Sequence, residues 1–157
     1  MPNALVAAAL GIGFVAGLRS FTAPAAVSWA AHLGWLNLHD SPLWFMGTTA
    51  AVAILSILAL AELVADKLPF TPNRTSAGPQ VGRIVMGGLS GACLGVSAGQ
   101  GVPLGAVLGG AGAVAGAFAG YQARRRLVEG LGARDLAVAL SEDLVAIALA
   151  YLIIAAR

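Results

Sequence analysis

Long apolar runs dominate the pattern of hydrophobic and polar positions along the chain. A helix needs about 20 mostly apolar residues to cross a bilayer. Runs that approach or reach this length cover 3–23, 43–65, 84–99, 103–123 and 136–156. They predict an all-α fold, an integral membrane helical bundle of about five transmembrane helices that forms one domain over 1–157. The run 84–99 is the shortest, so a four-span bundle in which it is re-entrant is the alternative.

The segment 24–42 separates the first two runs and differs from both in its side chains. Its large aromatic and imidazole side chains are Trp29, Trp35, His32 and His39, with Trp44 just beyond it. Tryptophan favours the headgroup level of a membrane. We therefore expect this segment to lie at the membrane–water interface.

Composition supports the membrane assignment. Of the 157 residues, 59% are hydrophobic and only 10% are charged, and the mean hydropathy is +0.86. An ordinary soluble domain is about 45–50% apolar and about 25% charged. Nine basic and seven acidic residues cannot form the polar shell that a chain this short needs in water. These values exclude a soluble enzyme, a nucleic-acid-binding module and a disordered tail, so no nucleic-acid partner is expected.

The basic residues are distributed unevenly between the connections. The connections 66–83 and 124–135 carry seven of the nine Lys and Arg residues, whereas 24–42 and 100–102 carry none. Basic residues concentrate in the cytoplasmic loops of membrane proteins. With five spans, this rule predicts a multi-pass protein of the inner (plasma) membrane with a cytoplasmic N-terminus and a C-terminus outside.

Glycines recur at every fourth residue within the later apolar runs. They are Gly87, Gly91, Gly95 and Gly99 in one run, and Gly112, Gly116 and Gly120 in the next. Residues at this spacing share one face of a helix, and a glycine face lets another backbone approach closely. We favour tight packing between 84–99 and 103–123. A homo-oligomer seam and a glycine-lined pore are the alternatives.

Ionisable residues inside the apolar runs are the main candidates for a functional site, because charge at membrane depth is costly. Arg19 lies near the end of the first run, where an arginine can snorkel to the membrane surface. Alternatively, Pro24 breaks the helix nearby and Arg19 binds an anion or a carboxylate at that break. Glu62 and Asp66 share a helix face and repel unless a proton, a basic residue or a cation lies between them. They form a candidate cation or proton site. Alternatively, Glu62 pairs with an arginine while Asp66 and Lys67 lie at the interface.

A second acidic pair, Glu142 and Asp143, lies about two turns into the last run. In the five-span topology it falls in the same half of the membrane as Arg124, Arg125 and Arg126. These residues could form one charged cluster, an inference that depends on the topology.

The connection 69–83 contains two further polar candidates, Asn73 and Arg74. Its prolines and glycines make a long helix there improbable. Such a loop can bind a phosphate or a lipid headgroup through an arginine and backbone amides, or serve as a rigid connector. The candidate headgroup or phosphate contacts are Lys67, Asn73, Arg74, Arg124, Arg125 and Arg126.

Two short fragments recur along the chain. ALAELVAD at 59–66 is similar to ALSEDLVAI at 139–147, and GFVAG at 13–17 is similar to GAFAG at 116–120. They suggest an inverted repeat with halves 1–68 and 103–157, as found in many secondary transporters. Because Ala- and Gly-rich sequence matches itself easily, a chance similarity is the alternative.

Three longer motifs stand out: GLRSFTAPAAVSWAAHLG, AELVADKLPFTPNRT and SEDLVAI. Together they resemble a bacterial family of polytopic membrane proteins classed only as a domain of unknown function, which implies no established activity. AELVADKLP is also similar to the Glu-x-Gly-Asp-Lys-Thr signature that cation/proton exchangers carry in two inverted halves. Here Glu62 and Asp66 are one residue further apart, the glycine is absent, and the second copy has no lysine.

These features predict a small membrane transporter or channel-like protein for a cation or a proton-coupled solute. Its candidate ion-binding residues are Glu62, Asp66, Glu142 and Asp143, with Arg19 or one of Arg124, Arg125 and Arg126 as the counter-charge. No resident cofactor is expected, although the four acids are candidate ligands of a divalent cation. The expected partners are membrane lipid, a small ion or solute, and a second copy of the chain. The alternatives are a membrane enzyme acting on a phospholipid or polyprenyl headgroup at the cytoplasmic face and a non-transporting scaffold.

Overall fold

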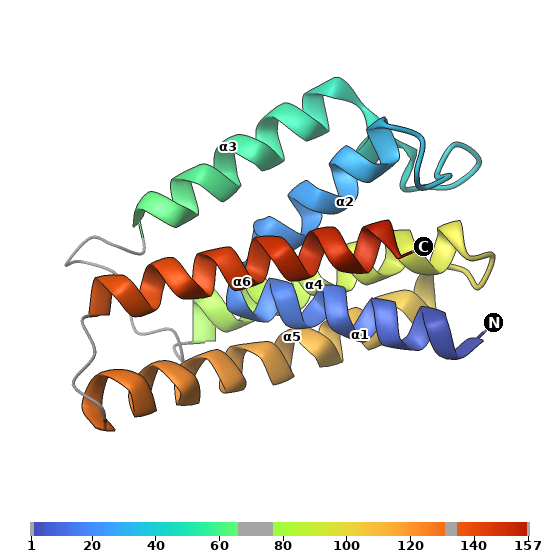
Figure 1. Ribbon diagram of the computed structural model, residues 1–157. Coiled ribbons are helices and arrows are strands. Elements are labelled where there is room, and N and C mark those ends of the chain that lie inside the picture. The colour runs from blue at the N-terminus through green and yellow to red at the C-terminus, as the bar shows by residue number, and fades with distance from the viewer. Residues whose placement is uncertain (1, 66–76, 131–134, 157) are drawn as a thin grey trace.

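The computed structural model describes residues 2–65, 77–130 and 135–156, and all of the regular structure in these ranges is helical (Figure 1). The prediction of an all-α fold is confirmed for this part of the chain. The elements in chain order are α1 (Pro2–Leu18), α2 (Thr22–His32), the 3₁₀-helix η1 (Trp44–Gly47), α3 (Thr49–Ala65), α4 (Ala77–Ser97), α5 (Val102–Arg125), the π-helical η2 (Arg126–Gly130) and α6 (Asp135–Ala155).

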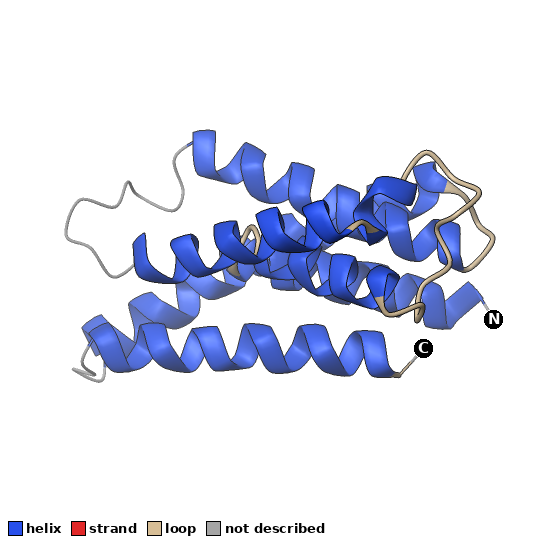
Figure 2. Cartoon of the chain, turned by 90° about the horizontal axis from the view of Figure 1, so that it is seen from above, coloured by secondary structure: helices blue, strands red, loops and turns tan. Residues whose placement is uncertain are grey.

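Helices α1, α4 and α5 form the most closely packed part of the bundle, and α6 lies against α1 (Figures 1 and 2). Helix α2 packs between this group and α3. The buried Ser28 of α2 donates a hydrogen bond to the carbonyl oxygen of Met46 in η1 at 2.5 Å. Helix α3 packs on α2 and η1 at the edge of the bundle, and Val52 is its buried residue. The bundle therefore has a dense side and a more open side.

Glycine allows the dense side to form. A Cβ atom added to Gly91 of α4 would overlap the carbonyl oxygen of Gly105 in α5, and one added to Gly13 of α1 would overlap that of Gly109. The glycines that meet the backbone of another element in this way also include Gly17, Gly87, Gly95, Gly112 and Gly116. Because these faces are covered within one chain, a homo-oligomer would have to use a different surface.

Two of the predicted packing glycines lie elsewhere. Gly99 lies in the turn between α4 and α5 with a φ of 71°, a left-handed conformation that favours glycine. A Cβ at Gly99 would contact nothing within 4 Å, so its assignment to a packing face is wrong. Gly120 faces the side chain of Leu18 rather than a backbone.

The predicted span 3–23 is interrupted. Helix α1 ends at Leu18 and α2 begins at Thr22, so a three-residue turn separates them. Pro24 is the third residue of α2, where its missing N–H would have had no partner inside the helix. The first part of the segment 24–42 forms α2, most of whose residues are buried inside the bundle.

The apolar pattern predicts the ends of α5 and α6 well and the start of α4 poorly. Helices α5 and α6 agree within two residues with the predicted spans 103–123 and 136–156. Helix α4 begins seven residues before the predicted span 84–99. Gly78 and Pro79, expected to prevent a helix, lie in its first turn, where proline is tolerated.

The turn at 19–21 also changes the topology. Figure 1 shows α2 running back toward the end of the bundle where α1 begins, and both views place the two chain termini at that same end. The five-span prediction, with its termini on opposite sides, is therefore wrong. The chain reverses between α1 and α2, whereas the segment 84–99 belongs to the continuous helix α4.

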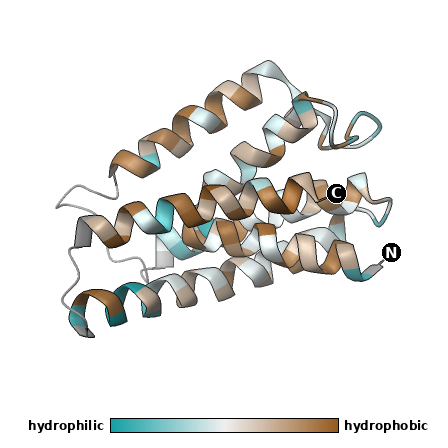
Figure 3. Ribbon diagram, viewed as in Figure 1, coloured by the Kyte–Doolittle hydropathy of each residue, from teal (hydrophilic) through white to brown (hydrophobic). Residues whose placement is uncertain are grey.

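Apolar helices are prominent in the described ranges. Two of them are long and apolar enough to cross a membrane, over Val102–Glu129 and Ala137–Ala155, and shorter apolar helices cover Asn3–Leu18 and Thr49–Ala65. Figure 3 shows hydrophobic residues along α3 and α6 and hydrophilic ones where α5 passes into η2. These properties support association with a membrane.

The glycine packing predicts opposite effects of the same substitution at two positions of α4. Gly91→Ala should lower the free energy of unfolding by about 1–3 kcal/mol, because the new methyl group overlaps the α5 backbone. Gly82→Ala, where a Cβ contacts nothing within 4 Å, should raise it by about 0.5–1 kcal/mol through helix propensity. Denaturant unfolding in a mild detergent measures both. Equal effects would contradict the packing argument.

Candidate functional site

Arg19 occupies the turn between α1 and α2 and is completely buried, with an exposed fraction of 0%. Its backbone N–H makes a hydrogen bond at the end of α1, to the carbonyl oxygen of Val15 at 2.8 Å. Its guanidinium Nη2 forms an ion pair with Oδ1 of Asp143 on α6. Asp143 is itself only 7% exposed. Residues 124 positions apart in the sequence therefore neutralise each other inside the bundle.

Glu62 of α3 binds the same turn from the opposite side. Its Oε1 accepts a hydrogen bond from the backbone N–H of Ser20 at 2.7 Å, and its Oε2 accepts one from Phe21 at 2.9 Å. The start of a helix has backbone N–H groups without intrahelical partners and a positive dipole end. Helix α2 has no side-chain cap from its own first residues. A carboxylate from a distant helix supplies this function.

The turn 19–21 is thus held by two carboxylates, Glu62 from α3 and Asp143 from α6. Each binds a positive group, a helix N-terminus for Glu62 and a guanidinium for Asp143. We call this set, with Arg19, the polar centre. Its position follows from the end of α1, where the chain turns back within the bundle.

The two remaining predicted acidic residues are Glu142 and Asp66. Glu142, although adjacent to Asp143, lies near Gly120 of α5, where an added Cβ would be 3.5 Å from its Oε1. In the aligned fragments Glu62 corresponds to Glu142, yet the inserted Asp143 is the residue at the polar centre. Asp66 lies outside the described residues.

Among the predicted headgroup contacts, the arginines of α5 and η2 can be placed. Arg124 is partly buried, Arg126 is exposed, and the exposed Arg125 pairs with Glu129 one turn later at 3.0 Å. Lys67, Asn73 and Arg74 lie outside the described residues.

A cavity of about 260 Å³ lies between α5, α6 and α1. Its polar lining residues are Arg124, Ser141 and Glu142, and its apolar walls include Leu18 and Val138. We call it the α5–α6 cavity. Glu142 therefore lines a different space from the one that Glu62 occupies at the α1–α2 turn.

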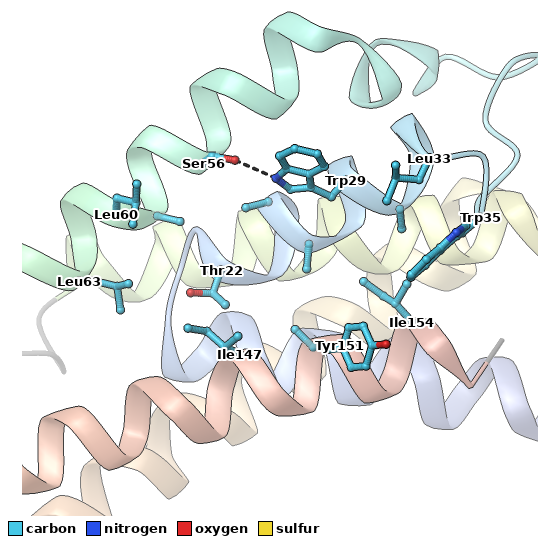
Figure 4. Close-up of a pocket in the computed structure, with 15 residues that line it drawn as sticks. Thr22, Trp29, Leu33, Trp35, Ser56, Leu60, Leu63, Ile147, Tyr151 and Ile154 are labelled. Atoms are coloured by element: carbon cyan, nitrogen blue, oxygen red, sulfur yellow. Dashed lines mark hydrogen bonds between the residues drawn. The ribbon is translucent and has the colours of Figure 1, made fainter.

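A larger groove of about 520 Å³ lies between α2, α3 and α6 (Figure 4). It is almost entirely apolar, with Leu60 on the α3 side and Ile147 on the α6 side. Trp29 of α2 spans it and donates a hydrogen bond from Nε1 to Oγ of Ser56 on α3 at 3.0 Å. Thr22, the first residue of α2, lines the groove beside the turn that holds Arg19.

The arrangement bears on the candidate metal site. Within the described ranges, no three His, Cys, Asp or Glu residues are grouped so that they could hold a metal ion. Glu62 faces backbone amides and Asp143 faces a guanidinium. These carboxylates are arranged to bind the positive groups of the protein.

Several buried polar groups could not be predicted from the sequence. The backbone amides of Ser20 and Phe21 carry no sequence signal, because every residue except proline has such a donor. Arg83, assigned to a cytoplasmic connection, lies on α4 and is buried. The prolines in the first turns of α2 and α4 are the signals that could have located those helix starts.

Comparison with known proteins gives one match. The family described as a domain of unknown function (DUF4126) matches residues 6–156, and the chain therefore belongs to this family. The resemblance to an uncharacterised family is confirmed. No curated protein and no solved structure matches the chain.

The buried ion pair predicts a non-additive mutation cycle. Asp143→Leu alone should lower the free energy of unfolding by about 3–5 kcal/mol, because it leaves the Arg19 charge buried without its carboxylate. Combining it with Arg19→Met should restore most of the loss, since the double variant buries an apolar pair instead. Unfolding in detergent measures the cycle, with the exposed-residue variant Glu129→Gln as a control. Additive losses would show that the pair is not coupled.

Proposed function

We propose that this member of the DUF4126 family is a small multi-pass membrane transporter that moves a solute together with protons. The proposal depends above all on one observation: a fully buried arginine at a helix break, bound by a carboxylate of another helix. Ionisable groups at membrane depth are rare and commonly belong to solute or proton pathways.

The exposed surface supports a membrane location. Large apolar side chains are exposed on several helices, and a soluble monomer rarely exposes extensive apolar patches. On α3 and α6 they include Ile54, Ile57, Leu60, Val64, Leu144, Tyr151 and Leu152. These side chains would face lipid tails.

The charge distribution supports one orientation. Arg124, Arg125 and Arg126 lie at the end of the bundle opposite both termini. The concentration of basic residues on the cytoplasmic side favours placing this end in the cytoplasm. Both termini would then lie outside the inner membrane, which revises the orientation expected from five spans.

The length of α2 supports a polar centre at membrane depth. Helix α2 has 11 residues. At 1.5 Å per residue it is about 17 Å long, roughly half of a 30 Å hydrocarbon core. Secondary transporters bind solutes near the bilayer midplane at discontinuous helices whose N-termini face anionic groups. The α1–α2 break offers such an N-terminus, with the amides that Glu62 binds, and adds the guanidinium of Arg19.

The chemistry favours protons over a metal cation. A proton added to Asp143 removes the negative charge that balances Arg19, and a proton added to Glu62 weakens its hold on the α2 N-terminus. The guanidinium and the amides can then bind an anionic group of a solute. Return of the carboxylates to their partners, with release of the protons, would discharge that solute.

Flux measurements in proteoliposomes test this mechanism. Vesicles containing a pH-sensitive dye receive an inward gradient of succinate, glutamate or inorganic phosphate, and the wild-type protein should acidify the lumen with at least one of them. The double variant Arg19→Met, Asp143→Leu should fold and give no proton movement, whereas Glu129→Gln should behave as the wild type. Unchanged flux in the double variant would exclude the polar centre as the pathway. A sodium gradient that makes the lumen alkaline would instead favour cation exchange.

A non-transporting scaffold is the second candidate. It is favoured by the fact that Glu62 and Asp143 already bind groups of the same chain. In that case the wild-type protein would move no protons with any of these solutes or with sodium. The double variant would insert into the vesicles and fold as the wild type does.

A further inference from the structure

We propose that the α5–α6 cavity binds one anionic phospholipid, with the phosphate at Arg124 and part of an acyl chain between the helices. This proposal requires the membrane location but does not depend on transport. The cavity is separate from the polar centre, because neither Arg19, Glu62 nor Asp143 lines it.

The walls of the cavity fit a hydrocarbon chain. They are formed by Phe14 and Leu18 of α1, Leu127 of η2, and Val138 and Val145 of α6. Three small residues of α5 leave the space open between them: Ala119, Gly120 and Ala123. Because Ala119, Ala123 and Val145 are exposed at the surface, the cavity is accessible from the side of the bundle.

The length of the cavity also fits part of a lipid chain. Its α5 and η2 lining extends from Ala119 to Leu127, a distance along the axis of about 12 Å at 1.5 Å per residue. Its α6 lining covers a similar length, from Val138 to Val145. A chain segment lying along both helices would contact apolar atoms on three sides.

The charge is concentrated at one end. Arg124 lines the cavity and is followed by Arg125 and Arg126. Among the charged side chains that the structure describes here, three arginines stand against two carboxylates: Glu129, which pairs with Arg125, and Glu142, which lines the cavity near Gly120. Figure 3 shows the corresponding hydrophilic region at the junction of α5 and η2. Basic pockets between membrane helices on the cytoplasmic side bind anionic lipid headgroups, and arginine binds phosphate through paired hydrogen bonds.

Ser141 adds a hydroxyl group to the lining of the cavity. Its hydroxyl donates to the carbonyl oxygen of Val138 at 2.8 Å, and its oxygen can still accept a hydrogen bond from a glycerol hydroxyl. A zwitterionic lipid such as phosphatidylcholine would fill the apolar walls, but its choline cation offsets the charge of its phosphate beside the arginines. A soluble phosphate would satisfy Arg124 but leave the apolar walls unfilled. An anionic phospholipid matches both.

Thermal unfolding with added lipid tests the proposal. The full-length protein in dodecyl maltoside is titrated with dioleoylphosphatidylglycerol, dioleoylphosphatidylcholine or glycerol 3-phosphate, and its tryptophan fluorescence is followed. Only the phosphatidylglycerol should raise the midpoint. Arg124→Gln should raise its half-saturating concentration about tenfold, as expected for loss of one charge-assisted contact.

Two further variants separate the cavity from general electrostatics. Arg125→Gln removes the same charge one residue away and should change the half-saturating concentration by about twofold or less. Ala119→Leu keeps every charge, fills the cavity from an exposed position and should weaken lipid binding as Arg124→Gln does. If Arg124→Gln unfolds, these two variants decide the question.

Four results would overturn the proposal. They are equal stabilisation by phosphatidylcholine, full stabilisation by glycerol 3-phosphate, equal effects of Arg124→Gln and Arg125→Gln, and wild-type binding by Ala119→Leu. Transport and lipid binding fail independently, because the double variant at Arg19 and Asp143 should lose flux while retaining the response to phosphatidylglycerol.

Discussion

A guanidinium buried inside a helical bundle must meet negative charge at the same place, since an unbalanced charge there is severely destabilising. Arg19 imposes this requirement on the chain. Asp143 meets it from α6, and Glu62 from α3 secures the amides that follow Arg19. The end of α1, the direction of α2 and the faces that α3 and α6 turn inward are all linked through this turn.

The two sides of the bundle are stabilised in different ways. On the dense side, glycines such as Gly91 and Gly105 bring helix backbones into direct contact, so even one added methyl group meets main-chain atoms. On the open side, α3 packs on α2 and η1 and has mainly exposed apolar side chains. Its hydrogen bonds to the rest of the protein include those of Glu62 to the turn and of Ser56 to Trp29. Backbone contacts therefore hold the dense side together, whereas apolar packing and a few side-chain hydrogen bonds hold α3.

The polar centre and the α5–α6 cavity contain different groups. In the centre, carboxylates from two helices hold positive groups of the chain itself. In the cavity, Arg124 stands at the end of an apolar space that reaches the surface. Asp143 and Glu142 are neighbours in sequence yet belong to the two separate sites, because adjacent residues on a helix point in directions about 100° apart. Helix α6 therefore contributes one residue to each of the two sites.

The residues alone predict the all-α class and the approximate extents of α5 and α6, and they identify Arg19, Glu62 and Asp143 as charged residues within apolar runs. Uninterrupted apolar runs and isolated charges are local signals, and they can be read without knowing the fold. The tertiary structure alone decided that the chain reverses at 19–21, that both termini share one end, and that Asp143 rather than Glu142 binds Arg19. Those outcomes depend on pairing between helices distant in sequence, and on backbone amides that every residue type except proline provides equally. Neither the pairing of the helices nor the use of these amides can be predicted from composition and residue spacing.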